Sequence, residues 1–168
     1  MSDPGLEQLL VRLYSNLAED RLVQSVTHDL RKKLNVDRVV LYYFYRQWLG
    51  RVTFESLSSS DYSILGSTGP DDCFNSEYAA LYQNGRINAI ANIETAPIAE
   101  CHRDFLQKMQ VKANLVAPIL PPAGLWGLLV AHHCQSPVDW SEEQTQAMQA
   151  GADILTQSKT ISGNSWQV

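Results

Sequence analysis

The N-terminal part of the chain carries two runs of apolar residues at helical spacing. Leucine and valine side chains recur at steps of three and four residues through positions 6–17 and again through 22–34. This pattern is typical of amphipathic helices that bury one face. Asp20 lies between the runs, and we expect its carboxylate to cap the second helix. Residues 1–35 are therefore predicted to form two N-terminal helices.

The pattern changes at Asp37. A run of β-branched and aromatic residues at 39–45 predicts a strand. Gly50 is expected to mark a turn, and residues 51–57 alternate well enough for a second strand, so that the two strands form a hairpin. Residues 58–72 are rich in Ser, Asp, Gly and Pro and are predicted to form a long loop. Loops of this length in compact domains are more often functional than idle.

The central residues predict two helices around one strand. A short helix is expected over about 74–83, and the pair Asn84-Gly85 ends it. Alternating apolar residues at 86–93 predict a strand with one buried face. A second helix is expected over about 95–109, because Pro97 would lie in its first turn, where the missing N–H costs little.

Two apolar strands and a last helix follow. The strands are predicted over 111–120 and 125–134, joined by a turn with the composition Pro-Pro-Ala-Gly. Ser141 and Gln144 have the spacing of a capping box, which predicts that the last helix begins there. The residues after Lys159 show no periodicity and are expected to be frayed.

This order of elements predicts an α/β (α+β) fold. Strands joined by tight turns favour a central, mainly antiparallel sheet, with the terminal helices on one face. The long loop and the two central helices would cover the other face and leave a ligand pocket there. We interpret residues 1–168 as a single domain with its core and last helix in 37–160 and a frayed tail at 161–168.

Composition and charge exclude several classes of function. The chain has 168 residues, 45% of them hydrophobic and 18% charged, which is an ordinary globular balance. A net charge of -5 is the wrong sign for a nucleic-acid binder. No apolar run approaches the roughly 20 residues that span a membrane. The three cysteines are too few for a disulfide framework. We therefore expect a soluble, cytoplasmic protein that binds neither nucleic acid nor membrane.

Two cysteines lie in sequence contexts that can carry chemistry. Cys101 is followed by His102 near the start of a predicted helix, so a thiol and an imidazole would project about 100° apart. By themselves, these two residues fit a buried cysteine beside a surface histidine better. Cys73 lies at the mouth of a helix, where a thiol ionises more easily, or it is an apolar anchor of the loop. Asp71 is either a helix cap or a carboxylate that points into the pocket.

Metal and enzyme readings are weaker. His132 and His133 alternate along the last strand, so only one of them can face the pocket. No standard spacing of metal ligands occurs, and neither a nucleophile elbow nor a phosphate-binding loop is present. A thiol hydrolase that uses Cys101 is conceivable, but nothing in the spacing singles it out. We expect no metal site, no catalytic residues and no enzyme activity.

Six strings, in order and at the right gaps, carry a resemblance to a known family. They are Asp37-Arg38-Val39-Val40, Asp71-Asp72-Cys73-Phe74, Tyr82-Gln83-Asn84-Gly85-Arg86, Glu100-Cys101-His102, residues 112–119 and residues 125–132. Together they resemble the bilin-binding GAF domain of a cyanobacteriochrome, a relative of phytochrome, from about Asp37 to the helix after Trp140. The resemblance implies a GAF fold and a photoreceptor sensory domain that binds a linear tetrapyrrole (phycocyanobilin or phycoviolobilin).

The resemblance assigns roles residue by residue. Cys101 matches the cysteine that forms a thioether with ring A, and His102 matches the histidine beside the inner rings. Asp71 matches the carboxylate that accepts hydrogen bonds from pyrrole N–H groups, and His132 matches the histidine near ring D, the ring that rotates. The remaining chromophore contacts implied are the propionate partners Arg86 and Lys112 and the packing residues Phe74 and Tyr78.

Cys73 decides the expected colour. The Asp-Xaa-Cys-Phe string resembles a subfamily in which a second, reversible thioether interrupts conjugation and shifts absorption to the blue. Rotation about the bridge between rings C and D would then break that linkage. If Cys73 does not reach the bilin, Cys101 alone would hold a chromophore that absorbs at longer wavelength.

Two other readings of the fold stay open. The rival from another class is a GAF module that binds a small ligand non-covalently, such as a cyclic nucleotide, or only dimerises. Such a pocket has no need of the Cys101 thiol.

The expected partner is an output signalling domain or protein outside this chain. The leucine run at 6–17 is interpreted mainly as core packing, and a homodimer through the terminal helices is a second interpretation of it.

Overall fold

A computed structural model of the chain describes residues 4–46, 49–69 and 76–163, except for the side chains of residues 76–78. One five-stranded sheet has the order β2-β1-β5-β4-β3, and all neighbouring strands are antiparallel. The strands are β1 (Arg38–Arg46), β2 (Leu49–Leu57), β3 (Asn88–Ile90), β4 (Ala113–Ile119) and β5 (Gly127–His133). The helices are α1 (Pro4–Glu19), α2 (Arg21–Leu34), α3 (Ser76–Gln83), α4 (Glu100–Lys108), α5 (Glu142–Leu155) and α6 (Lys159–Ser162), with a 3₁₀ turn at Ser60–Tyr62.

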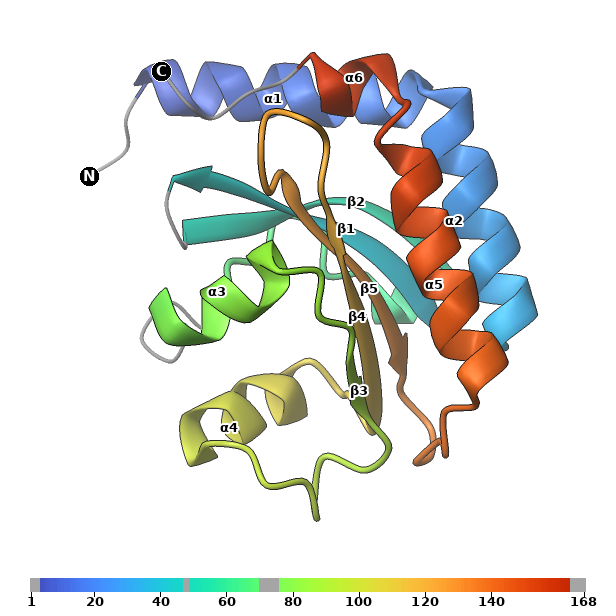
Figure 1. Ribbon diagram of the computed structural model, residues 1–168. Coiled ribbons are helices and arrows are strands. Elements are labelled where there is room, and N and C mark those ends of the chain that lie inside the picture. The colour runs from blue at the N-terminus through green and yellow to red at the C-terminus, as the bar shows by residue number, and fades with distance from the viewer. Residues whose placement is uncertain (1–3, 47–48, 70–75, 164–168) are drawn as a thin grey trace.

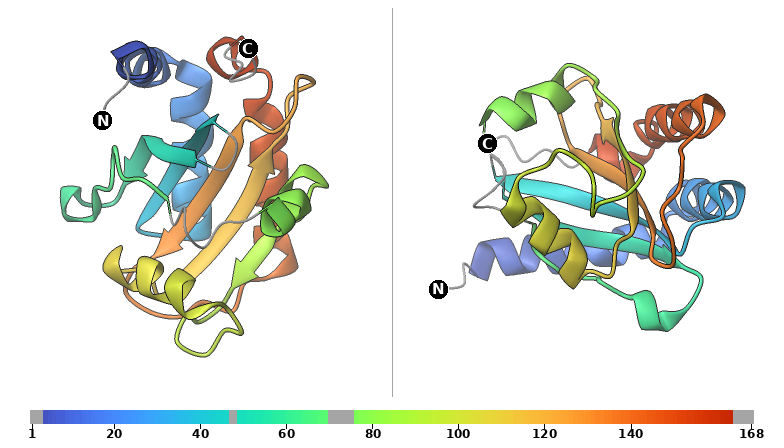
Figure 2. Two further views of the ribbon diagram at one scale, coloured as in Figure 1. Left: turned by 90° about the vertical axis from the view of Figure 1, so that its left-hand side faces the viewer. Right: turned by 90° about the horizontal axis from the view of Figure 1, so that it is seen from below.

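Helices cover both faces of the sheet (Figures 1 and 2). The terminal helices α1, α2, α5 and α6 lie on one side, and the central helices α3 and α4 lie on the other. The predicted order of elements, the antiparallel sheet and the placement of the terminal helices are confirmed. No helix in the described ranges is long and apolar enough to cross a membrane.

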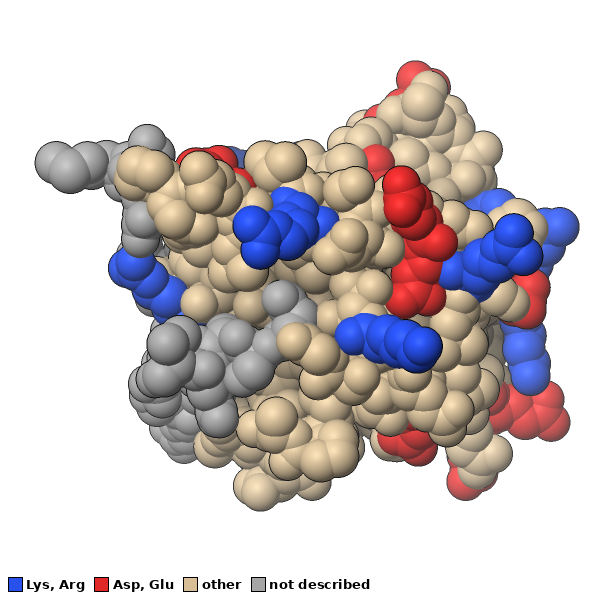
Figure 3. Space-filling model, turned by 90° about the horizontal axis from the view of Figure 1, so that it is seen from above, with Lys and Arg blue, Asp and Glu red and all other residues tan. Residues whose placement is uncertain are grey.

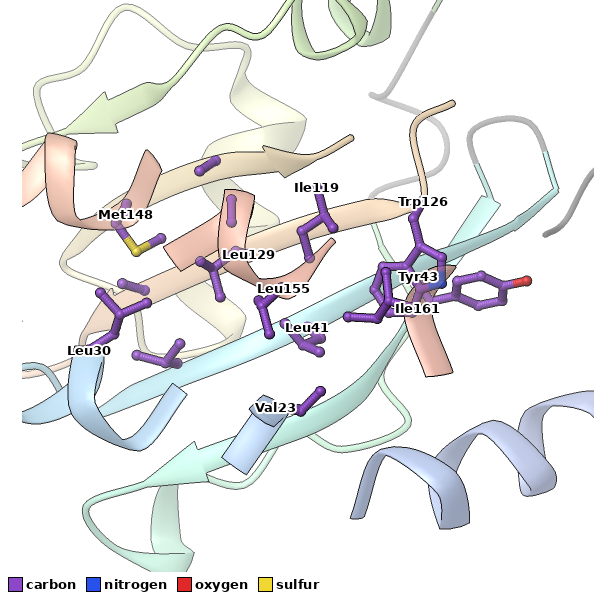
Figure 4. Packing of buried hydrophobic residues seen from close by; sticks show 14 of the residues in the cluster. Val23, Leu30, Leu41, Tyr43, Ile119, Trp126, Leu129, Met148, Leu155 and Ile161 are labelled. Carbon is purple, nitrogen blue, oxygen red and sulfur yellow. The ribbon is translucent and has the colours of Figure 1, made fainter. Parts of the chain in front are cut away.

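The alternation of side chains along the strands sorts the apolar residues into two clusters. Odd-numbered residues such as Leu41, Ile119 and Leu129 pack against the terminal helices in the larger cluster, which Figure 4 shows. Even-numbered residues such as Val40 and Val130 form a smaller cluster on the opposite face. Because successive strand residues point to opposite faces, the central strands are buried on both sides.

Both predicted caps are present. The Asp20 carboxylate accepts hydrogen bonds from the backbone N–H groups of Leu22 (3.0 Å) and Val23 (3.1 Å). Ser141 and Gln144 form the predicted capping box at the start of α5. These caps satisfy N–H groups that have no partner within the helix, and they fix where α2 and α5 begin.

Several boundaries differ from the sequence predictions. Gly50 is not in a turn: it lies inside β2 opposite Phe44, and a Cβ there would overlap the ring of Tyr42. The strand predicted over 86–93 is only three residues long, because β3 pairs with β4 through residues 88–90 alone.

The helix predicted from residue 95 begins at Glu100 instead, and Pro97 lies outside it. Residues 93–95 form a turn, and the chain bends at 96–97. The Asn92 side chain accepts a hydrogen bond from the N–H of Glu94 (3.0 Å). Arg103 donates to the backbone carbonyls of Ile93 (2.8 Å) and Ala96 (2.6 Å). Because these contacts satisfy the turn, the chain does not need a helix there.

The C-terminal tail is more ordered than predicted. Residues 159–162 form α6, and Ile161 is only 1% exposed within the larger cluster. Ser158 caps this helix by accepting from the N–H of Ile161 (3.2 Å), and its hydroxyl donates to Asp20 (2.7 Å). The prediction of a frayed tail from residue 161 is therefore wrong for residues 161–163, and the rest of that tail lies outside the described residues.

Candidate functional site

A pocket lies on the face of the sheet that α3 and α4 cover. Its cavity volume is about 90 Å³, and part of it is open to solvent. Most of its lining is aliphatic or aromatic. The polar or aromatic-hydroxyl side chains among its described lining residues are Tyr42, Tyr82, His102, Asn114 and His132.

The sheet positions three polar residues in a row across neighbouring strands. Arg38 on β1 pairs with His132 on β5, and His132 pairs with Asn114 on β4. Directly opposed residues share one face of a sheet. His132 and Asn114 both line the pocket, and all three residues are buried.

His132 is held from the β1 side. Its Nδ1 accepts a hydrogen bond from Nε of Arg38 (2.9 Å). Burial and, secondarily, the nearby positive charge of Arg38 hold the pKa of His132 well below its ordinary value, so the ring is neutral.

The Arg38 side chain connects His132 to two further segments. One of its terminal nitrogens donates to the carbonyl oxygen of Tyr62 (2.8 Å) in the 3₁₀ turn, and the other donates to the carbonyl oxygen of Met109 at the end of α4. Burial lowers the pKa of Arg38, but a guanidinium remains protonated near neutral pH. The site therefore contains a buried cation that binds three separate parts of the chain.

Asp37 secures the backbone next to Arg38. Its carboxylate accepts hydrogen bonds from the N–H of Cys134 (2.7 Å) and from the side-chain amide of Gln135 (2.7 Å). Its backbone carbonyl accepts from the N–H of Ser58 (2.9 Å). These contacts fix the start of β1 against the end of β5, and so they fix the position from which Arg38 extends.

Helix α4 presents one face to the pocket. His102, Phe105, Leu106 and Met109 line it, and steps of three and four residues place them on one side of the helix. Burial lowers the pKa of His102 below its ordinary value. The helix thus supplies a flat, neutral aromatic ring and an apolar wall.

Cys101 precedes His102 and is exposed, so it does not line the pocket itself. Its sulfur is disulfide-bonded in this structure. Adjacent helical residues project about 100° apart, so Cys101 and His102 leave α4 in different directions. Any reaction of Cys101 with a ligand requires the reduced thiol.

The structure brings together some of the predicted site residues and not others. His102 and His132 both line the pocket, from α4 and β5. Arg86 and Lys112 are exposed and are not part of the lining, and a nitrogen of Arg86 lies 3.5 Å from the side-chain oxygen of Asn88. Asp71, Cys73 and Phe74 lie outside the described residues, and so does the side chain of Tyr78.

Three residues of the site were missed from the sequence. Tyr42 lines the pocket, and its ring lies where Cβ atoms at Gly50 and Gly69 would be. The Asn114 side chain is 3% exposed, and its oxygen has no hydrogen-bond partner among the described residues. Arg38 stands out in the sequence only within the string Asp37-Arg38-Val39-Val40. The alternation of β1 and the presence of Asn and Arg within buried apolar strands were the signals that could have found them.

Comparison with known proteins identifies the family of the chain. Residues 19–158 match the family described as GAF domain. An uncharacterized protein of Picosynechococcus sp. is 47% identical over 92% of this chain and 95% of its own length. The chain spans only 16 to 22% of the longer curated relatives that it matches, among them a putative methyl-accepting chemotaxis protein of Synechocystis.

Solved structures agree with the family match. The cyanobacteriochrome receptor PixJ superposes with a TM-score of 0.76 at 29% identity, covering 88% of this chain and 95% of that one. The phycocyanobilin-bound GAF domain of a cyanobacterial phytochrome superposes with a TM-score of 0.71 at 29% identity, covering 92% and 93%. The same arrangement of sheet and helices therefore occurs in a cyanobacteriochrome receptor and in a phycocyanobilin-bound GAF domain.

Proposed function

Because the chain belongs to the GAF domain family, we propose that it is a photoreceptor sensory domain that binds a linear tetrapyrrole covalently through Cys101. The GAF fold implied by the resemblance is confirmed by the family match and by the superposition on PixJ. The phycocyanobilin-bound relative supports a bilin as the ligand class. We propose phycocyanobilin, or phycoviolobilin formed from it, for this chain.

The observation that supports the proposal is that Cys101 directly precedes a pocket residue in α4. The next residue, His102, lines the pocket from the same helix. A thiol that adds to a carbon–carbon double bond forms one S–C bond, and its proton goes to the neighbouring carbon, so no oxidant or leaving group is needed. A pocket for a non-covalent ligand has no use for such a thiol.

The pocket residues fit the chemistry of a bilin. Aliphatic and aromatic side chains suit its flat conjugated rings and exclude water from them. The unpartnered amide oxygen of Asn114 can accept a hydrogen bond from a pyrrole N–H group, which would satisfy a buried polar atom. When bound, the bilin would supply light absorption and an isomerisable double bond between rings C and D.

The charged contacts remain proposals from the sequence resemblance. Arg86 and Lys112 lie at exposed positions, which suit propionate groups that stay hydrated rather than groups buried in the pocket. Asp71, Phe74 and Tyr78 are proposed as further chromophore contacts. A second, reversible thioether from Cys73 is proposed to tune colour. The alternative is a single-cysteine photosensor that absorbs at longer wavelength.

A cyclic nucleotide is a poorer fit to this pocket. Phosphate recognition uses lysine, arginine or a helix N-terminus. Among the described residues that line the pocket, none is Lys or Arg. The mostly aliphatic and aromatic lining suits the flat rings of a bilin better than a charged phosphate group.

The proposed output uses the terminal helices and a partner outside this chain. Val11 on α1 is 63% exposed, whereas Leu10, Leu13 and Leu17 on the same helix are buried in the larger cluster. On the face that includes α1, acidic and basic side chains are interspersed among uncharged ones (Figure 3). We propose that an output domain or a second copy of the chain contacts this face, while the leucines hold the helix to the sheet.

The test is expression together with the enzymes of bilin synthesis, followed by denaturing gel electrophoresis with zinc-enhanced fluorescence. The wild-type chain, kept reduced, should give a fluorescent band, and Cys101→Ala should lose it. Cys134→Ala is the matched control, because Cys134 is a free, buried cysteine and its loss should leave the band. A band that persists in Cys101→Ala would place attachment elsewhere, and a wild-type chain without a band would refute the proposal.

A further inference from the structure

We propose that Arg38 is a positioning residue: it holds the His132 ring as the Nε2–H tautomer, so that the pocket receives one fixed N–H donor from β5. The use of that donor toward a bilin rests on the proposed function. The fixed tautomer itself follows from contacts within the chain and can be measured without pigment.

The direction of the hydrogen bond determines the tautomer. Nε of arginine carries a hydrogen and offers no acceptor, so His132 Nδ1 must accept in the contact of 2.9 Å between them. A neutral imidazole whose Nδ1 accepts carries its hydrogen on Nε2. The other tautomer would set two N–H groups against each other.

The doubly protonated ring is excluded by the same contact. It would also place an N–H of His132 against the guanidinium, and it would bring two positive charges together in a site where His132 is 4% and Arg38 is 0% exposed. Burial and the Arg38 charge lower the pKa of His132 accordingly. The ring is thus confined to one of its three protonation forms.

Arg38 can fix the tautomer of His132 because its own side chain is held in one conformation. Its register opposite His132 is fixed by the ladder between β1 and β5. Its two terminal nitrogens bind the carbonyl oxygens of Tyr62 and Met109, and a planar guanidinium fixes the direction of all its donors at once. A lysine at this position would keep the charge but could not reproduce this set of donors.

The same side chain connects the two ends of the proposed binding site. The carbonyl oxygen of Met109 belongs to the C-cap of α4, the helix that carries Cys101 and His102. One guanidinium therefore contacts both the helix of the proposed attachment site and the histidine on β5. Loss of Arg38 should release the tautomer of His132 and the end of α4 together.

The first experiment reads the tautomer directly. Long-range ¹H–¹⁵N correlation spectra of the pigment-free, histidine-labelled chain, with His132 assigned through His132→Asn, distinguish protonated from unprotonated ring nitrogens. We expect an unprotonated Nδ1 and a protonated Nε2 in the wild type. A wild-type ring that is protonated at Nδ1, or that exchanges between both forms, would overturn the proposal even if no Arg38 variant folds.

The second experiment changes Arg38. In Arg38→Met the two ring-nitrogen shifts of His132 should move toward each other, because the donor to Nδ1 is lost and both tautomers are then sampled. Arg103→Met is the matched control: Arg103 also binds two carbonyl groups near α4, but these belong to the turn before the helix and do not line the pocket, so the His132 shifts should stay unchanged. Unchanged shifts in the folded Arg38→Met variant would contradict the proposal.

A third measurement uses the pigmented protein. Arg38→Met should retain the covalent band but shift the absorption of at least one photostate, and the shift should vanish in the His132→Asn background. A shift of equal size in both backgrounds would show that Arg38 acts independently of His132 and would overturn the proposal. If the wild type binds no bilin, the proposed function fails, while the tautomer measurement still decides the role of Arg38.

Discussion

The same strands form both faces of the sheet, but helices pack closely against one face and leave a pocket on the other. On the face of the terminal helices, leucine, isoleucine, tyrosine and tryptophan side chains pack together in the larger cluster (Figure 4). On the other face α3 and α4 leave a pocket, and the row of Arg38, His132 and Asn114 lies in or beside it. Alternating side-chain directions along the same strands can therefore build a stabilising core on one face and a binding pocket on the other.

Truncation of two neighbouring leucines, one on each face of the sheet, should show the largest difference between the two faces. Leu129 points into the filled core, and Leu128 lines the pocket from the next position of β5. Leu129→Ala should lower the free energy of unfolding by about 4 kcal/mol, and Leu128→Ala by about 2 kcal/mol, because a cavity costs less where space already exists. Urea unfolding of both variants measures the difference. Equal losses would mean that the two faces contribute alike.

Acid should weaken the pocket face through His132. The pKa of His132 in the folded chain lies well below the ordinary value of 6.5. Below about pH 6.5 this ring is therefore protonated in the unfolded chain but stays neutral in the folded chain. The unfolded state then binds more protons, and stability is lost as pH falls from 6.5 toward the folded pKa. The loss for one such histidine is about 1.4 kcal/mol per pH unit.

Urea unfolding of the wild type and His132→Asn at about pH 7.5 and about pH 5 measures this slope. The variant should lose less stability on acidification than the wild type does. The pKa of His102 is also lowered by burial, so part of the slope should remain. Identical slopes in both proteins would exclude His132 as the source.

A moderate effect is expected at the junction of the terminal helices. Asp20 caps α2 and accepts a hydrogen bond from Ser158 before α6. Burial alone would raise the pKa of Asp20, but the hydrogen bonds from Ser158 and the backbone outweigh it and lower that pKa. Asp20→Ala should lower the free energy of unfolding by about 1 kcal/mol. The exposed Asp29 of α2 is the control. Asp29→Ala should change the free energy of unfolding by less than about 0.5 kcal/mol.

The smallest effect is expected for Asn114→Leu, which should not destabilise the chain as the changes above do. Asn114→Leu replaces a buried amide whose oxygen has no partner among the described residues, so the free energy of unfolding should stay the same or rise by up to about 1 kcal/mol. The absorption spectrum of a bound bilin should nevertheless shift. Asn88→Leu, at a buried asparagine with hydrogen-bond partners, should instead lose stability. A loss of stability in Asn114→Leu would mean that this amide is satisfied.

Local patterns predicted most of the fold. The alternation of strands, the helical leucine runs and the caps at Asp20 and Ser141 each depend on residues close together in the sequence. The turn before α4 was missed because it depends on Arg103, which binds carbonyl groups up to ten residues earlier. The short helix α6 was missed because a single buried residue, Ile161, has no periodicity to reveal it.

The candidate site was predicted only in part. His102 and His132 were found, because each lies in a short string of recognisable residues. The relation of His132 to Arg38 spans 94 positions and arises from strand register, which single-sequence patterns leave undetermined. The same holds for Asn114 and Tyr42, which look like ordinary strand residues until neighbouring strands place them on the pocket face.

The most direct test of the central claim is peptide mapping of the purified protein after bilin exposure. Trypsin separates the cysteines, because cleavage after Arg86, Arg103 and Lys112 places Cys101 in peptide 87–103, Cys73 in 52–86 and Cys134 in 113–159. The account predicts that peptide 87–103 carries the mass of one bilin and absorbs visible light. An unmodified peptide 87–103, from protein prepared with bilin in excess, would contradict it.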